Sequence, residues 1–128
     1  MKKVSVLGKL QKEADKLNQL RNKRLYKLCE ACGGQNQVGH HWIEKSRSAN
    51  LRYRQENMIP LCNSCHSKIH NVFGNSVVGG LNVADAIIKK RGRAWKNRMD
   101  IDGRKTIRVN REHYLKVIGE LDGDKTLD

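Results

Sequence analysis

Two cysteine pairs constrain the fold of this chain more than any other feature. The pairs are Cys29/Cys32 and Cys62/Cys65, and the sequence contains no other cysteine. A spacer of two residues inside a turn lets both thiolates of a pair converge on one tetrahedral Zn²⁺. Two disulfides suit a secreted chain, and a redox-active pair is expected within a βαβ pattern that neither pair has. We therefore predict that the four cysteines bind one structural Zn²⁺.

The length and the charge of the chain indicate one small domain with a polyanionic partner. The chain has 128 residues, 26 of them Lys or Arg against 13 Asp or Glu, so its net charge is +13. Such a charge predicts binding to nucleic acid ahead of an anionic membrane. No apolar run reaches the roughly 18–20 residues of a membrane span, and the apolar part of the N-terminus is too short for a secretory signal. We expect a cytoplasmic protein with no membrane partner, either a monomer or a homodimer.

The positive charge is concentrated at the two ends of the sequence. Residues 1–28 hold nine basic and two acidic side chains, and residues 89–111 hold ten basic and two acidic ones. Residues 29–88 are nearly neutral, with five basic and four acidic side chains. This division predicts a neutral centre flanked by basic segments that contact phosphates. Solvated faces of ordinary packed helices are the alternative.

Periodicity and capping residues predict helices on both sides of the cysteine pairs. The predicted helix over residues 9–28 has an apolar stripe of Leu10, Ala14, Leu17, Leu20, Leu25 and Leu28. Three more helices are predicted: from an Asn63 cap to about Val72, with Ile69 and Phe73 inward, from an Asn82 cap to Gly92, and from an Asn110 cap to Leu121. Residues 75–80 read as a loop and residues 104–109 as a strand. The predicted divisions are 1–28, 29–73, 74–121 and a frayed tail, 122–128.

Four of the five histidines lie within residues 40–70. His66 and His70 are four residues apart, so on a helix they share a face and can hold one ion. His40 on a neighbouring strand is a candidate third ligand, which leaves His41 as a base. Adjacent strand residues point to opposite faces, so His40 and His41 can serve one site only if the strand bends or ends there. Gly39 makes such a bend easier, and the ligand and base roles could be exchanged.

These residues resemble the HNH endonucleases of the ββα-metal (His-Me finger) class. The resemblance covers about residues 29–70 and rests on the His40-His41 pair, Asn57, and the run Asn-x-x-Pro-Leu-Cys-x-x-Cys-His that ends at His66. The cysteine pairs match the subgroup that braces this motif with zinc. More weakly, the basic N-terminal helix and residues 46–53 resemble phage recombination nucleases of the NinG kind, from which the chain departs at His66, where Asn is expected.

The resemblance implies an α+β fold and a specific chemistry. The fold would be a small ββα-metal core braced by the four-cysteine zinc site, with basic helices at both ends. His41 would be the general base in hydrolysis of DNA phosphodiester bonds, and Asn57 would fix the loop between the strands and orient His41. His40, His66 and His70 would bind one catalytic divalent ion, Mn²⁺, Ni²⁺, Co²⁺, Zn²⁺ or Mg²⁺, and imidazole ligands disfavour Mg²⁺. The NinG resemblance implies a phage or prophage protein of the bacterial host, acting in DNA recombination, repair or packaging.

Three arginines near the histidines, Arg47, Arg52 and Arg54, are predicted to bind DNA phosphates. The alternative is that they lie on a solvated loop.

Other readings of the site residues stay open at this point. Asn57 could only cap a turn, His70 could face solvent, and His66 or His70 could replace a cysteine as a zinc ligand. Trp42 and Trp95 are expected in the core rather than stacked on bases, and His113 is expected to be structural. For the whole chain, the alternative is a zinc-stabilised DNA-binding module without catalysis. An RNA-binding zinc protein is the weakest alternative, because the sequence has no aromatic cluster.

Overall fold

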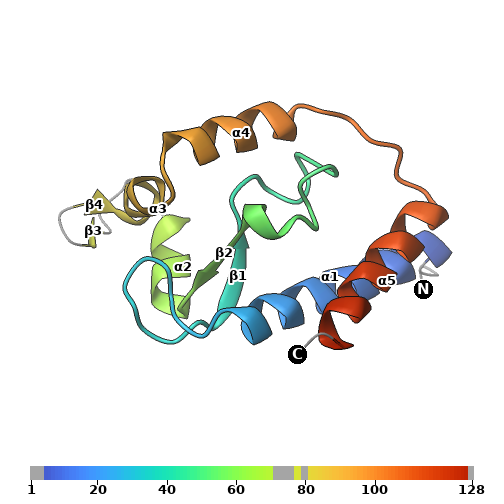
Figure 1. The fold of residues 1–128 in the computed structure, drawn as a ribbon, viewed down its shortest axis with the longest axis horizontal. Coiled ribbons are helices and arrows are strands. Elements are labelled where there is room, and N and C mark those ends of the chain that lie inside the picture. The colour runs from blue at the N-terminus through green and yellow to red at the C-terminus, as the bar shows by residue number, and fades with distance from the viewer. Residues whose placement is uncertain (1–4, 71–76, 79–80, 127–128) are drawn as a thin grey trace.

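The computed structural model describes residues 5–70, 77–78 and 81–126, and these form the predicted α+β fold (Figure 1). A two-stranded antiparallel sheet of β1 (Val38–His41) and β2 (Met58–Leu61) lies at its centre, followed by α2 (Asn63–Ile69). In the register of the two strands, Gly39 lies opposite Pro60, and His40 lies opposite Ile59. All four β2 residues are buried, so this strand lies at the centre of the ββα unit.

One hydrophobic cluster joins this unit to the chain that follows. Ile59 and Leu61 of β2 pack with Cys29 and Cys65, and with side chains from two later helices. Those helices are α3 (Val83–Arg91), which contributes Ile87, and α4 (Arg93–Gly103), which contributes Trp95 and Met99. The cysteine centre is therefore part of the core.

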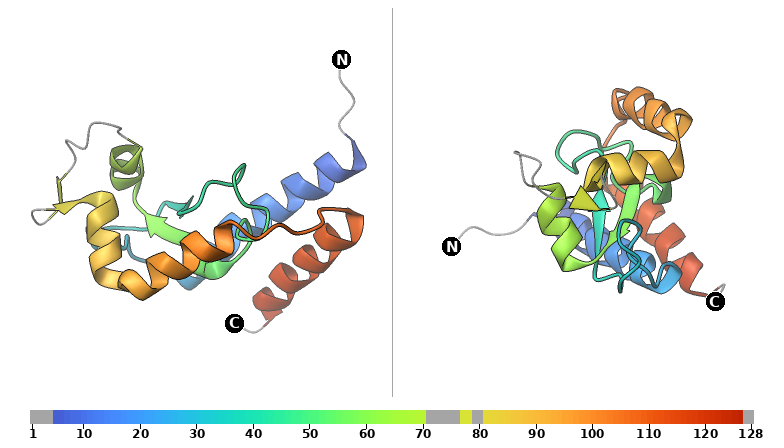
Figure 2. Two further views of the ribbon diagram at one scale, coloured as in Figure 1. Left: turned by 90° about the horizontal axis from the view of Figure 1, so that it is seen from above. Right: turned by 90° about the vertical axis from the view of Figure 1, so that its left-hand side faces the viewer.

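A second hydrophobic cluster holds the two ends of the chain together. It joins α1 (Val6–Leu25) to α5 (Arg111–Thr126), which lie side by side in Figures 1 and 2. Ala14 and Leu17 of α1 pack against Tyr114, Val117 and Leu121 of α5. Among the described residues, no helix combines the length and the hydropathy needed to cross a lipid bilayer.

The predicted apolar stripe on the N-terminal helix is wrong in its second half. Leu20, Leu25 and Leu28 are exposed, while three polar residues of α1, Asn18, Arg21 and Asn22, are buried. The physical reason is that this half of α1 faces polar backbone of the central unit, including the Arg52 and Tyr53 carbonyls, instead of an apolar surface.

Capping residues gave correct predictions at two of the three positions where they were used. Asp85 N–H donates to Asn82 Oδ1 (2.8 Å) at the start of α3, and His113 N–H donates to Asn110 Oδ1 (2.9 Å) at the start of α5. At α2 the cap is Cys62 and not Asn63. The predicted end of this helix at Val72, together with Phe73, lies outside the described residues.

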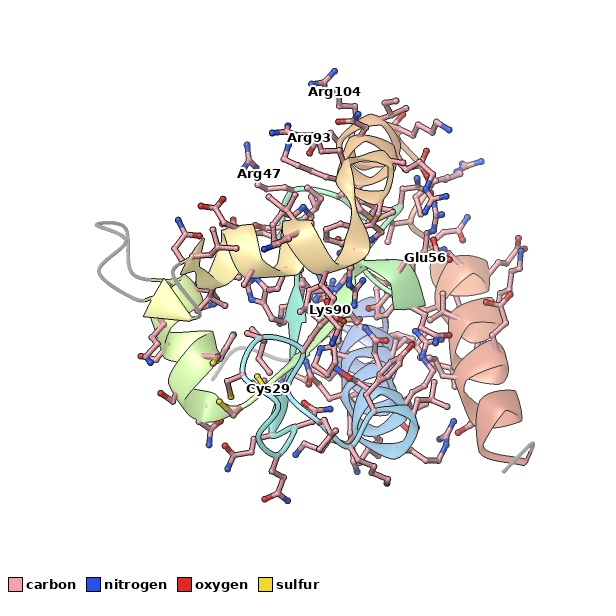
Figure 3. All side chains as sticks on the ribbon, turned by 60° about the vertical axis from the view of Figure 1, so that its left-hand side comes forward. Cys29, Arg47, Glu56, Lys90, Arg93 and Arg104 are labelled. Carbon is pink, nitrogen blue, oxygen red and sulfur yellow. The ribbon has the colours of Figure 1, made fainter. Side chains whose placement is uncertain are left out.

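The sequence analysis predicts no helix at α4, because it treats these residues only as part of the basic segment 89–111. Its inner side is formed by Trp95 and Met99, which are buried and four residues apart, so a helical signal was present. Gly92, with φ of +94°, makes the sharp turn between α3 and α4. Figure 3 shows Arg93 and Arg104 projecting outward around this helix, with Arg47 on the same side.

The predicted strand over residues 104–109 is wrong. This segment is irregular and largely exposed, including Ile107 and Val109. Its alternating pattern suits a strand, but a strand needs a neighbour, and both sheets in the described part of the chain are formed by other segments.

Two further differences concern the loop and the tail. Within the predicted loop 75–80, β3 (Val77–Val78) pairs with β4 (Leu81–Asn82), and residues 75–76 and 79–80 lie outside the described residues. Helix α5 continues to Thr126, so the predicted frayed tail is helical over most of its length.

Candidate active site and metal centre

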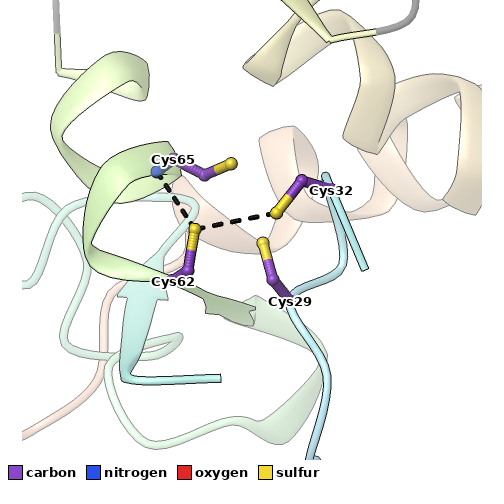
Figure 4. Close-up of side chains that lie close together, drawn as sticks. All are labelled: Cys29, Cys32, Cys62 and Cys65. Carbon is purple, nitrogen blue, oxygen red and sulfur yellow. Dashed lines mark hydrogen bonds between the residues drawn. The ribbon is translucent and has the colours of Figure 1, made fainter. Parts of the chain in front are cut away.

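The four cysteine side chains meet at one point (Figure 4), with their sulfur atoms all within 4.8 Å of one another. The Cys32 and Cys62 Sγ atoms are 3.7 Å apart. A tetrahedral ion with Zn–S bonds of about 2.3 Å separates its sulfur ligands by about 3.8 Å. A disulfide needs about 2.05 Å, and all four cysteines are free. The donor set therefore fits one tetrahedral metal ion and does not fit two disulfides.

The backbone around the first pair prepares its thiols for metal binding. Gly33 adopts φ of +79° and donates its N–H to the Cys29 carbonyl (2.9 Å), which closes the turn. The next N–H, that of Gly34, points at Cys32 Sγ (3.4 Å). Burial raises the pKa of Cys29, but backbone N–H groups, those of Cys32 first, outweigh this effect and lower the pKa to about 7. A lowered pKa favours the thiolate, which is the form that binds a metal.

The second pair begins α2, and the same helix carries two histidines. Cys62 caps the helix through its sulfur, which accepts from Cys65 N–H (3.4 Å). His66 follows Cys65 directly and His70 lies one turn later. The cysteine centre therefore also sets the position of these two imidazoles.

Three imidazoles converge between α2 and β1. The ring nitrogens of His40, His66 and His70 all lie within 4.8 Å of one another, and the Nε2 atoms of His66 and His70 are 3.0 Å apart. All three rings line a cavity of about 610 Å³, which we call the histidine cavity; its wall also includes Gly39, His41, Arg52 and residues 44–46. This arrangement fits a divalent ion with imidazole ligands.

The electrostatics of the cluster favour neutral imidazoles. Burial first, and then the neighbouring His70 and His66 rings, lower the pKa of His40 to about 3. Burial and then His70 lower the pKa of His66. A neutral imidazole has a lone pair to donate to a metal ion, whereas protonated rings at these distances repel one another.

His41 lies at the end of β1 and lines the same cavity as His40. Its Nε2 is 2.9 Å from the Arg52 carbonyl oxygen. A carbonyl only accepts, so Nε2 carries the proton and Nδ1 of the neutral ring is left as an acceptor. Burial first, and then the charges of Lys45 and Arg52, lower the pKa of His41 to about 4, against the opposing effect of the hydrogen bond to the Arg52 carbonyl. His41 is therefore unprotonated at Nδ1 at neutral pH.

Asn57 is completely buried and holds the loop that carries the Arg52 carbonyl. Its Oδ1 accepts from Ile43 N–H (2.8 Å), and its Nδ2 donates to the Ile43 and Leu51 carbonyls (3.1 and 3.3 Å). One side chain thus joins the beginning of this loop, just after His41, to its end, just before Arg52.

Two polar residues of α1 reach the site, and sequence reasoning missed both. Gln19 forms two hydrogen bonds of 2.9 Å to Gly39, one to its carbonyl and one from its N–H, and so pairs with the free edge of β1 beside His40. Asn18 Nδ2 donates to the Arg52 carbonyl (3.1 Å), which also accepts from His41. A Cβ at Gly39 would clash with Asn22 Nδ2, which also belongs to α1, so only glycine at this position allows α1 to lie so close to β1. Apolar periodicity carries no signal for such contacts.

The three predicted DNA-binding arginines differ in their partners. Arg52 lines the histidine cavity but forms a bidentate ion pair with Asp15 (3.0 and 2.7 Å). Arg54 pairs with Glu56 (2.7 Å) and Asp102 (3.0 Å). Arg47 is exposed, with no acidic partner among the described residues.

The remaining aromatic candidates lie where they were expected. Trp42 and Trp95 pack on one another in the core, with ring centroids 5.0 Å apart. His113 lies against Tyr53 and Tyr114 and outside the histidine cavity.

Comparison with known proteins gives one match, to the central part of the chain. Residues 29–72, about a third of the sequence, match the family model described as HNH endonuclease. No curated protein and no solved structure matches the chain. The matched range begins at the first cysteine of the metal centre and includes the histidine pair, Asn57 and α2, so the family match and the two convergent side-chain clusters coincide.

Proposed function

Residues 29–72 carry an HNH endonuclease domain, and from this premise we propose that the chain is a metal-dependent nuclease that hydrolyses DNA phosphodiester bonds. The domain itself indicates nuclease activity on nucleic acids. The single observation that supports the finer proposal is the histidine cavity, where three imidazoles converge and which His41, with its unprotonated Nδ1, also lines.

In the proposed mechanism His41 is the general base. The Arg52 carbonyl holds its Nε2–H, so Nδ1 is the atom that removes a proton from the attacking water. The resulting imidazolium keeps its hydrogen bond to the carbonyl and is stabilised by it. Asn57 is a positioning residue, because it holds the loop that supplies this carbonyl.

His40, His66 and His70 are the residues that would hold the catalytic divalent ion. When bound there, such an ion supplies positive charge that offsets the charge developing on the phosphoryl group and on the departing 3′ oxygen. The cysteine centre is proposed to hold a structural Zn²⁺ and to have no part in the reaction. A role in phage DNA recombination, repair or packaging in the bacterial cytoplasm follows only from the weaker NinG resemblance and belongs to this proposal.

A plasmid-nicking assay with added Mn²⁺, Ni²⁺, Co²⁺, Zn²⁺ or Mg²⁺ tests the proposal. We expect His41→Ala to reduce cleavage by about 10²–10⁴-fold, the usual contribution of a general base. DNA binding should persist, because His41 is not a source of positive charge at neutral pH. His113→Ala is the matched control and should cleave like the unmodified chain, since His113 lies outside the histidine cavity.

Cleavage that survives His41→Ala would remove this residue from the mechanism. Metal-independent DNA binding with no cleavage under any of the five ions would instead support the zinc-stabilised binding module, which has no need for a convergent imidazole cluster.

A further inference from the structure

A second cavity, of about 610 Å³, is lined in part by the loop that also borders the histidine cavity. One wall is formed by Ile43 and residues 47–49, and the other by Asp100 and residues 103–107. We call it the basic cleft. Residues 44–46 of the same loop line the histidine cavity, so neighbouring parts of one loop line both cavities. Residues 103–107 lie outside the HNH match and belong to the C-terminal part of the chain.

The two walls of the basic cleft are fastened to each other. Asn50 Nδ2 donates to the Asp102 carbonyl (2.9 Å), and the Asp102 carboxylate pairs with Arg54 (3.0 Å). Gly103 packs directly on the loop, since a Cβ there would lie 3.5 Å from Ile43 and Leu51 side-chain carbons. The cleft is therefore formed before any ligand arrives, which lowers the entropic cost of binding.

The arginines of the cleft have no carboxylate partner in the described part of the chain, in contrast to Arg52, Arg54 and Arg91. Within the described residues, Arg52, Arg54 and Arg91 are engaged in ion pairs with carboxylates. Arg47 and Arg104 are exposed, and no carboxylate of the described chain pairs with either. Figure 3 shows both projecting outward on the same side of the molecule.

The other charged groups of the cleft do not cancel the positive charge of Arg47 and Arg104. Asp100 is neutralised by Lys96 (2.8 Å), and Lys105, although paired with Asp102, keeps its side chain 63% exposed. A guanidinium without a carboxylate partner is suited to bind phosphate oxygens through two parallel hydrogen bonds.

We propose that the basic cleft binds backbone phosphates of duplex DNA beside the bond that is cut, with Arg47 and Arg104 as the two contacting residues. This inference rests on the proposed function, because it takes DNA as the substrate, and it assigns the C-terminal part of the chain a direct share in substrate binding. Contacts of this kind position the duplex and carry no base specificity.

The test compares Arg47→Ala/Arg104→Ala with the lysine variant Lys116→Glu, at an exposed position of α5 outside both basic segments, so that both variants lower the net charge by two. Both are made in the His41→Ala chain, which keeps the DNA intact. Affinity for a short duplex is measured over a range of salt concentrations. Each lost phosphate contact lowers the slope of log K against log salt by about 0.9. In the arginine variant the magnitude of this slope should therefore fall by about 2, and the affinity for DNA at moderate salt should fall by about tenfold or more. The slope of the lysine variant should not change.

Neutral methylphosphonate groups placed singly along the duplex give a second measurement. They should weaken binding of the His41→Ala chain at one or two positions displaced from the cleavage point, and have no effect there on the arginine variant. Circular dichroism should show unchanged folding, because both side chains are exposed and neither forms an ion pair with a described carboxylate.

An unchanged affinity and salt slope in the arginine variant would overturn the proposal, and so would an equal loss in the lysine variant. Failure of the proposed nuclease activity is read separately, from cleavage by the unmodified chain with metal. A chain that binds through the cleft but does not cut would contradict the activity and leave the cleft in place.

Discussion

Asn57 shows how one buried amide can organise a reactive histidine that it does not touch. Its three hydrogen bonds join Ile43 to Leu51, so the loop returns to bring the Arg52 carbonyl to His41 Nε2. The proton on Nε2 then leaves Nδ1 as the basic atom. The identity of the base atom thus depends on a backbone carbonyl eleven residues away in the sequence.

Asn57→Ala should lower the free energy of unfolding by about 2–4 kcal/mol, because it leaves the Ile43 N–H and two carbonyls without their partner in a buried site. Cleavage should fall in the same variant even at temperatures where it is fully folded, since the loop no longer holds the Arg52 carbonyl in place. Urea unfolding and the nicking assay measure the two effects. Asn97→Ala, at an exposed position of α4, is the control and should change neither. Wild-type activity in folded Asn57→Ala would contradict a positioning role.

At the scale of elements, the ββα unit takes two supports from outside its own sequence. Helix α2 has only seven residues, too few for an isolated helix to be stable in water, and its first turn carries two of the four sulfur ligands. Strand β1 has β2 on one side only, and on its other edge Gln19 of α1 pairs with both backbone groups of Gly39. The side-chain amide of Gln19 acts as a short substitute for a third strand.

Gln19→Leu should loosen this edge of β1 at the residue next to His40. We expect a loss of about 1–3 kcal/mol in unfolding free energy, because two backbone groups lose their hydrogen bonds, and weaker binding of the divalent ion to the histidine cluster. Calorimetric titration of a non-activating metal into the zinc-loaded chain measures the second effect. Gln11→Leu is the matched control on the same helix, since Gln11 Nε2 donates to the Tyr114 hydroxyl beside the other hydrophobic cluster (3.1 Å). Equal metal affinity in the Gln19 and Gln11 variants would show that α1 has no influence on the cluster.

At the scale of the whole molecule, the two proposed metal sites are joined through one helix and should respond differently to mutation. The sulfur centre lies in the main hydrophobic cluster, where Cys29 and Cys65 are buried among Ile59, Leu61 and Ile87. His70, in contrast, is exposed at the end of α2. Loss of a sulfur ligand therefore affects the core, whereas loss of His70 affects only the cavity.

Cys29→Ser should release zinc, lower the melting temperature sharply and abolish cleavage, because metal binding at such a centre is part of the folding free energy. His70→Ala should retain about one tightly bound zinc per chain and its melting temperature, but cleave more slowly at a given concentration of added ion. Metal analysis, thermal circular dichroism and the nicking assay distinguish the two. A Cys29→Ser chain that folds and holds zinc as before would remove the structural role of the centre.

The parts of the fold and of the site that follow from local spacing could be predicted. The two-residue spacers brought each cysteine pair together, the four-residue spacing placed His66 and His70 on one helix face, and Asn82 and Asn110 began helices where their side chains predicted. The predicted strand and the second half of the apolar stripe each needed a partner distant in the sequence, and both went wrong. Residues 104–109 alternate like a strand but have no strand beside them, and Leu20, Leu25 and Leu28 follow a helical stripe that meets no apolar surface.

The ligand types and the excess of positive charge therefore follow from composition, and the local geometry of the ligands follows from spacing within one or two turns. Which side chains share a cavity, and which charges have a carboxylate partner, depends on the folded structure. Arg52 and Arg47 look alike in the sequence, yet Asp15, thirty-seven residues before Arg52, neutralises one of them and leaves the other exposed. The side-chain amides of Asn18 and Gln19 follow the same rule. A polar group is satisfied by whichever partner the fold brings within hydrogen-bonding distance, and spacing along the chain does not encode that distance.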